Sequence, residues 1–153
     1  MADNTELLLY MADRAQHIAE VIRPALDQGK AVICDRYYDA TLAYQGYARG
    51  LDIGLINSLH TAVLGRVTPD LTLLLDLPPR VGLSRAWTQI DAGARNEKET
   101  RFEEEALDFH RRVRAGYLEL ARQAPDRFRV IDAARRVEAV RGDIVRALEG
   151  VFQ

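Results

Sequence analysis

The stretch PDLTLLLDLPP, residues 69–79, holds the clearest strand pattern in this sequence. Its residues from Leu71 to Leu77 are mostly apolar, and a strand without regular polar alternation is typical of a parallel sheet covered by helices on both faces. Prolines bound the run on both sides. Pro78 and Pro79 predict the start of a helix, because proline's restricted φ and missing N–H are tolerated in a first helical turn.

Two shorter apolar runs, Ala31–Cys34 and Phe128–Asp132, predict two further strands. The intervals between the strands have the apolar spacing of helices, which are expected over residues 5–28, from residue 41, over 52–64, from 79, from 101 and over 137–151. Strands that alternate with helices in this way predict a three-layer α/β sandwich with a parallel sheet.

The first predicted helix has its apolar residues three or four positions apart, which would put them on one buried stripe: Leu8, Met11, Ala15, Ile18 and Ile22. Gly29 is expected to end this helix in the manner of a C-terminal glycine. Pro24 is expected to kink or shorten its last turn, because proline cannot donate the backbone hydrogen bond.

Composition narrows the class of protein. The chain has 153 residues, enough for one domain, and 21 Lys+Arg against 23 Asp+Glu, so its net charge of −2 provides no general attraction to nucleic acid. No apolar run is long enough to span a membrane, and the N-terminus lacks the pattern of a signal peptide. A single cysteine, Cys34, cannot form an internal disulfide, which favours a reduced, cytoplasmic protein.

Ligands of open parallel sheets bind beyond the carboxyl ends of the strands, which here are Asp35-Arg36-Tyr37, 76–79 and 132–135. A carboxylate and a guanidinium at the tip of a buried strand are costly unless they meet a ligand, a metal or each other. Asp35 could therefore hold the water shell of Mg²⁺, and Arg36 could bind a phosphate. The alternative is that these two residues form an ion pair that caps the strand.

The segment 37–50 is rich in Tyr, Arg, Gln and Gly, side chains that can stack on a base and read its edge. Arg14 follows Tyr10 by four positions, which puts a cation and an aromatic ring on the same helix face. Both features also occur in ordinary cores and solvated helix faces. The polar segment 91–100 predicts a mobile lid, although a plain surface loop has the same composition.

Several segments together resemble a known family, and they follow its order along nearly the whole chain: 6–17, 35–37, 43–46 with 49–50, 69–76, 101–103, 112–118 and 130–133. The family is thymidylate kinase, the P-loop nucleoside-monophosphate kinases that make dTDP from dTMP and ATP. The resemblance implies a P-loop kinase-like fold, in-line phosphoryl transfer, ATP with Mg²⁺ as the phosphate donor, and nucleotides as the binding partners.

The resemblance also implies site residues. Those of the dTMP site would be Tyr10, Arg14, Arg36, Tyr37, Thr41, Tyr44 and Gln45, with Tyr10 on the base and the two arginines on the phosphate. Those of the ATP side would be Arg85, Arg95 and Arg101 on the phosphates, with Ala133 to Arg135 beside the adenine. Asp35 would lie near Mg²⁺, and the catalytic residues would be Asp35, Arg36 and Arg101.

One part of the family pattern is missing. These residues contain no Gly-x-x-x-x-Gly-Lys-Ser/Thr loop, which cradles the ATP phosphates in the family. We therefore expect a single kinase-like domain over 1–153, truncated at its N-terminus and lacking the family's first two strands and first helix. The absent first strand would lie between those at Ala31 and Leu71, so its loss would leave backbone groups on both neighbours unpaired.

Two other functions compete with a kinase portion. A non-catalytic remnant that binds nucleotide or a partner would also keep the acceptor motifs without a phosphate loop. A deoxynucleoside kinase is the third interpretation, and the pair Arg14 and Arg36 argues against it because that acceptor has no phosphate. Family members commonly form homodimers through helices of this region, which makes the first helix a candidate interface.

Overall fold

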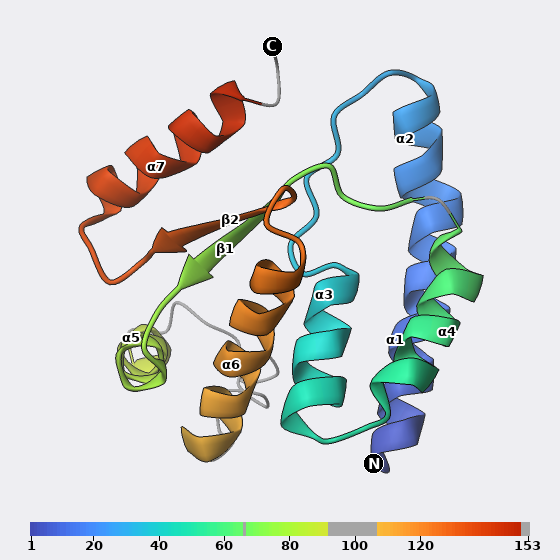
Figure 1. Cartoon of the computed structure of the whole chain (residues 1–153), viewed down its shortest axis with the longest axis horizontal. Helices are drawn as coiled ribbons and strands as arrows, with labels where there is room; N and C mark the ends of the chain where they lie inside the picture. Colours follow the sequence, from blue (N-terminus) through green and yellow to red (C-terminus); the bar gives the residue numbers. More distant parts are fainter. Residues whose placement is uncertain (66, 92–106, 151–153) are drawn as a thin grey trace. The chain divides into compact units, whose positions relative to one another are not determined.

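A computed structural model describes residues 1–65, 67–91 and 107–150, with side chains omitted for 86–91. The chain divides into two compact units, Met1–Pro69 and Asp70–Gln153, and each is described by itself. The first unit is helical and the second combines helices with a sheet (Figure 1). No described helix is both long and apolar enough to cross a bilayer.

The first unit begins with a continuous helical segment: α1 (Asp3–His17), the π-helical turn η1 (Ile18–Ile22) and α2 (Arg23–Asp27). The π-turn lies just before Pro24, and the Arg23 N–H donates to the Ile18 carbonyl five residues back. Proline supplies no N–H, so the regular ladder is interrupted at this point. Gly29 follows with φ of 71°, a left-handed conformation that glycine adopts without strain, so the predicted helix and its end are confirmed.

The second half of this unit contains α3 (Tyr38–Thr41), which continues into the π-helical segment η2 (Leu42–Ala48), and α4 (Ile53–Leu64). Asp52 caps α4: its Oδ1 accepts hydrogen bonds from the backbone N–H groups of Gly54 at 2.6 Å and Leu55 at 3.2 Å. Gly46 lies where a Cβ would collide with the Ile53 side chain, so its lack of a side chain lets η2 pack closely on α4.

The core of the first unit corrects one detail of the predicted stripe. Leu8 is 56% exposed, whereas Leu7 is 1% exposed and occupies the inward position. The inward residues on this segment are Leu7, Met11, Ile18 and Ile22. These positions repeat at intervals of four and seven, which follows the helix face more closely than a series that begins at Leu8.

The second unit is built on two parallel strands, β1 (Thr72–Asp76) and β2 (Phe128–Asp132), in register from Thr72 opposite Phe128 to Asp76 opposite Asp132. Helices α5 (Pro79–Asp91), α6 (Leu107–Gln123) and α7 (Val137–Glu149) complete it. Helix α6 packs against both strands and α7 against β2 (Figure 1). The parallel pairing and the helix that starts at Pro79 agree with the sequence-based predictions.

The predicted strand Ala31–Cys34 is not formed. All four residues lie outside regular secondary structure and are exposed, with Ile33 99% exposed. A strand exists only when a neighbour pairs with its backbone groups, and no described strand pairs with this segment. The strands that do form are also less covered than predicted, since Leu75 and Val130 are each 50% exposed.

The last helix covers less of the second unit than its sequence indicates. Val140, Ile144 and Leu148 are half-buried on one side of α7, as predicted, but Val137 at its start is 77% exposed. Val151 lies outside the described residues. The buried apolar residues of this unit come instead from α6 and β2: Phe109, Val113, Leu120, Ala121, Phe128 and Ile131.

Candidate functional site

The turn that contains Asp35 and Arg36 has a strained backbone. Arg36 has φ of 61°, the left-handed conformation that costs a residue with a side chain about 1 kcal/mol or more. Both side chains are exposed, and the structure describes no ion pair between them, so the capping pair considered from sequence is not formed. The Arg36 guanidinium instead lies over the Tyr44 ring, 5.5 Å from its centroid.

Arg14 projects from α1 toward the same segment. Its guanidinium donates to the Thr41 hydroxyl at 2.7 Å and lies 5.6 Å from the centre of the Tyr37 ring. Tyr37 is itself held by a hydrogen bond from its hydroxyl to the Val67 carbonyl at 3.1 Å. Burial lowers the pKa of Arg14, and the guanidinium stays protonated because its ordinary value lies so far above neutral pH.

Gln45 is buried and takes part in a polar cluster that the sequence-based assignment of roles did not include. Its amide Nε2 donates to Glu6 Oε1 at 2.9 Å, and the residues are 2% and 5% exposed. Arg49 Nε lies 3.2 Å from the same Glu6 oxygen, and its NH1 lies 3.7 Å from Asp3 Oδ1. The sequence held a signal that could have identified Glu6 as a site residue. Glu6 is four residues before Tyr10, on the helix face that also presents Arg14.

His60 is a second buried polar residue without an assigned role. It is 4% exposed, its ring meets the Tyr38 ring edge to face at 5.3 Å, and neither of its nitrogens has a hydrogen-bond partner among the described residues. Burial, with a smaller contribution from the positive charge of Arg14, lowers the pKa of His60 from 6.5 to about 4. The imidazole is therefore neutral at physiological pH.

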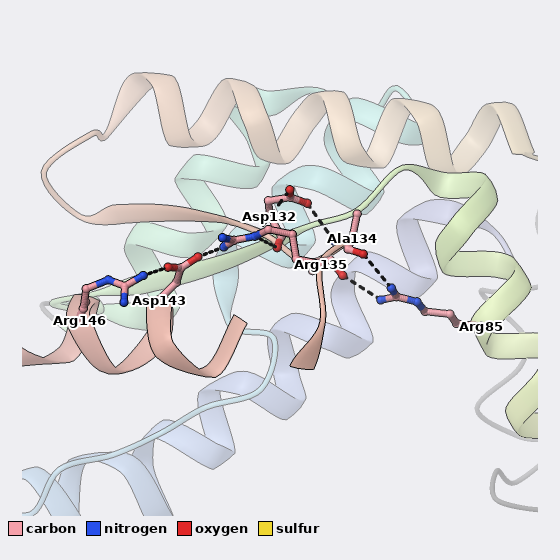
Figure 2. A network of polar contacts seen from close by, with 7 residues as sticks. Arg85, Asp132, Ala134, Arg135, Asp143 and Arg146 are labelled. Carbon is pink, nitrogen blue, oxygen red and sulfur yellow. Dashed lines mark hydrogen bonds and ion pairs between the residues drawn. The ribbon is translucent and has the colours of Figure 1, made fainter. Parts of the chain in front are cut away.

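The second unit brings Arg85 next to the loop Ala133 to Arg135, both predicted for the ATP side; Figure 2 shows Arg85 beside Ala134 and Arg135. The Arg85 guanidinium donates to the carbonyls of Ala133 at 2.8 Å and Ala134 at 3.4 Å, which fixes the loop after β2. The Arg135 side chain donates to the Asp132 carbonyl at 3.3 Å and forms an ion pair with Asp143. Arg95, Arg101 and the predicted lid 91–100, apart from the helical Asp91, lie outside the described residues.

The end of strand β1 is occupied by an ion pair within the protein. Asp76 receives two parallel hydrogen bonds from Arg114, at 2.6 Å and 2.8 Å. These bonds lower the pKa of the Asp76 carboxyl below its ordinary value. The pair ties α6 to the end of the sheet, so this carboxylate has a structural partner in the described protein.

The described residues fit a magnesium ion only if nucleotide phosphates supply some of its ligands. Among the described residues no group of three or more His, Cys, Asp and Glu side chains could enclose a metal. Asp35 is a single exposed carboxylate beside the strained turn. Mg²⁺ is usually held by one or two carboxylates together with waters and substrate phosphates, and Asp35 meets that requirement.

The first unit therefore gathers the parts needed to hold a phosphorylated planar ligand. Arg14 and Arg36 supply fixed positive charge, and the rings of Tyr37 and Tyr44 supply flat apolar surface beside them. Thr41 and Gln45 contribute hydrogen-bonding groups from the adjacent helical segment. Tyr10 is half-buried on α1, the helix that carries Arg14.

Comparison with known proteins gives one consistent result. A family model for thymidylate kinase matches residues 1–144. A thymidylate kinase of Desulfosudis oleivorans is 52% identical over 151 residues, which cover 99% of this chain and 71% of that protein. One of Solidesulfovibrio magneticus is 58% identical over 138 residues, 90% of this chain and 66% of that protein. A crystal structure of thymidylate kinase from Ehrlichia chaffeensis, 31% identical, matches with a TM-score of 0.72 over 97% of this chain and 65% of that one.

The matches cover a larger share of this chain than of the related proteins. Nearly all of this chain is matched, whereas it spans only about two thirds of the length of the relatives, from 71% down to 65% in these three cases.

Proposed function

Because this chain belongs to the thymidylate kinase family, we propose that it carries the acceptor site for phosphoryl transfer from ATP to dTMP, which gives dTDP. The observation that carries the proposal is the cluster in the first unit. Two arginines, Arg14 and Arg36, lie there against tyrosine rings, with Thr41 bonded to one of them. A nucleoside monophosphate offers the matching pair of groups, a charged phosphate and a flat base.

In this proposal the acceptor phosphate is bound by Arg14 and Arg36, and the thymine stacks on Tyr10. Thr41, Tyr44 and Gln45 line the base and sugar, and Tyr37 belongs to the same dTMP site. The strained turn at Arg36 supports the assignment, because strained conformations gather at ligand-binding positions where the surrounding structure holds them. The hydrogen bond from the Tyr37 hydroxyl to the Val67 carbonyl holds the Tyr37 ring in place before any ligand arrives.

The donor side of the proposal uses residues of the second unit and of the lid. Arg85, Arg95 and Arg101 would stabilise the ATP phosphates, and Ala133 to Arg135 would border the adenine. Arg85 already donates two hydrogen bonds to the loop after β2, so we assign it the further task of shaping that loop. A magnesium ion held through water by Asp35 would neutralise the charge on the transferring phosphate.

Transfer in this site needs no covalent intermediate on the protein. The arginines position the acceptor oxygen in line with the donor phosphate and neutralise charge that develops there. The phosphate-loop motif is absent from these 153 residues, so we expect the chain by itself to bind dTMP without measurable kinase turnover. A coupled assay with ATP and Mg²⁺ that gives a normal rate would overturn this expectation.

Calorimetric titration with dTMP tests the acceptor site directly. Arg36→Ala removes charge-assisted hydrogen bonds to the phosphate and is expected to weaken dTMP binding by about 10-fold to 100-fold. Arg80→Ala is the matched control, since Arg80 is an exposed arginine of α5, in the other unit. Equal dTMP affinity for the wild type and Arg36→Ala would contradict the proposal.

A non-catalytic role for the same site is the second candidate, and the intact acceptor motifs without a phosphate-loop motif favour it. The two candidates separate in a complementation experiment. The portion of the Desulfosudis oleivorans relative that this chain does not match would be added as a separate polypeptide. Restored turnover supports the kinase portion, and continued dTMP binding without turnover supports the non-catalytic role.

We also propose a cytoplasmic homodimer that uses α1. Leu8 and Leu9 on this helix are each 56% exposed, which leaves apolar surface beside the polar cluster of Glu6. Sedimentation equilibrium of the wild type and of a Leu8→Glu, Leu9→Glu variant would test the interface. A dimer that persists in the variant would rule out this surface.

A further inference from the structure

We propose that Glu6, neutralised by Arg49, locks the side-chain amide of Gln45 in one orientation and thereby makes the base site select pyrimidines that carry a proton on N3. The inference rests on the proposed function, which places Gln45 beside the base. Glu6 is a positioning residue in this arrangement, because it acts through Gln45.

The lock follows from what each group can donate or accept. A carboxylate has acceptor oxygens only, whereas a primary amide has an acceptor oxygen at one end and a donor nitrogen at the other. Nε2 of Gln45 lies 2.9 Å from Glu6 Oε1 in a buried setting. Turning the amide over would place its oxygen against the carboxylate oxygen, and both groups would lose their hydrogen bond where water cannot replace it.

Arg49 makes the buried carboxylate tolerable. A buried charge needs a partner of opposite sign, and Arg49 Nε lies 3.2 Å from the Glu6 oxygen that also accepts from Gln45. The Arg49 side chain is 17% exposed and is shared with Asp3, whose side chain is 49% exposed. The cluster is therefore anchored at the surface end by Asp3 and reaches inward through Arg49 and Glu6 to Gln45.

In the proposed site, the locked amide turns its oxygen toward the ligand. No described residue donates a hydrogen bond to Gln45 Oε1, since the only hydrogen bond described for this side chain is the one to Glu6. An oxygen can accept from N3–H of thymine or uracil. The N3 of cytosine has a lone pair and no proton, so it would face this oxygen with two acceptors opposed.

Selectivity then depends on whether the amide can turn over. In the reversed orientation Nε2 would take the place of the oxygen and could donate to cytosine N3. A charge-assisted hydrogen bond disfavours that orientation by roughly 10-fold to 100-fold in population. Glu6→Ala removes the bias, because alanine at position 6 neither accepts from Gln45 Nε2 nor donates to Gln45 Oε1, whereas a glutamine there would keep its oxygen toward Arg49 and Gln45.

The expected result has a distinctive pattern. With two orientations of equal population, the affinity for dTMP falls only about twofold, since about half of the molecules are competent. The affinity for dCMP rises by about fivefold to 50-fold, because the reversed amide is no longer rare. A merely structural role for Glu6 would weaken both nucleotides together, so a gain in dCMP binding identifies the lock.

The experiment is calorimetric titration of dTMP and dCMP into the full chain, as wild type, Glu6→Ala and the control Asp3→Asn. The control removes a carboxylate from the same cluster, with the same change in charge, and leaves the Glu6–Gln45 hydrogen bond in place. It is expected to keep the wild-type preference for dTMP. A Glu6→Ala protein with an unchanged ratio of dTMP to dCMP affinity overturns the inference, while dTMP binding in the wild type leaves the proposed function standing.

A double variant keeps the inference testable if Glu6→Ala alone unfolds. Glu6→Gln combined with Gln45→Glu preserves the net charge and reverses the hydrogen bond, so position 45 presents only acceptor oxygens to the ligand. This variant is expected to retain the preference for dTMP over dCMP. Loss of that preference overturns the inference, and failure of the wild type to bind either nucleotide removes both the inference and the proposed function.

Discussion

Lowering the pH from 7 to 5 should destabilise this protein through His60. The imidazole is buried and neutral, with a pKa lowered from 6.5 to about 4. Between these values the unfolded chain binds a proton that the folded protein does not, so stability is lost as the pH falls through 6.5 toward 4. At roughly 1.4 kcal/mol per pKa unit, the full loss is about 3 kcal/mol, of which about 2 kcal/mol is reached at pH 5.

The variant His60→Phe isolates this effect. A phenyl ring keeps the edge-to-face contact with Tyr38 and cannot be protonated, so about 2 kcal/mol of the pH dependence between pH 7 and pH 5 should disappear. Asp76 and Glu119 also have lowered pKa values, but their ordinary values are 3.8 and 4.5. Most of the change in stability that they cause therefore occurs below pH 5. Urea unfolding followed by circular dichroism at both pH values measures the difference.

His17→Gln is the matched control, because His17 is exposed on α1. The His17→Gln variant should lose about as much stability between pH 7 and pH 5 as the wild type does. The reasoning is refuted if His60→Phe loses as much stability as the wild type over this range. It is equally refuted if an NMR titration of the His60 ring protons gives a pKa of 6 or above.

Three substitutions test the local structure. Gly46→Ala should lower the free energy of unfolding by about 1–3 kcal/mol, because the new Cβ meets Ile53; an unchanged melting temperature would contradict the close packing. Asp52→Ala should cost about 1 kcal/mol through loss of the α4 cap, measured by urea unfolding against Asp52→Asn, which keeps a capping oxygen. Asp76→Asn should destabilise the protein by only up to about 1 kcal/mol at pH 7, because its partner Arg114 is partly exposed. The difference in stability between wild type and variant should vanish as the pH falls through the lowered pKa of Asp76. A difference that persists in acid would refute the stabilising role of the Asp76–Arg114 pair.

Local patterns predicted most of the elements that form. The first helical segment ends just before Gly29, the strand after Pro69 and the strand at Phe128 run in parallel, and a helix starts at Pro79, all as the sequence indicates. These features depend on proline and glycine chemistry and on apolar spacing within one segment. The family likewise follows from motifs in their order along the chain, and the relatives confirm it.

The side-chain roles were less predictable. Gln45 was expected beside a ligand, and its amide nitrogen is bonded to Glu6, a residue that had no assigned role. Arg85 was expected on phosphates and donates to the backbone of the loop after β2. His60 showed no partner spacing in the sequence, and its unusual state arises from burial between elements that are distant along the chain.

The sequence by itself therefore determined the helices, two of the three predicted strands and the family, and it supplied the candidate residues of the proposed nucleotide site. Only the tertiary structure decided that Ala31–Cys34 is not a strand, that Leu7 replaces Leu8 in the core, and which polar groups meet. The physical reason is the range of the interactions. Helix periodicity and turn chemistry act within a few residues, whereas strand pairing, burial and hydrogen bonds such as Glu6 to Gln45 join residues that only folding brings together.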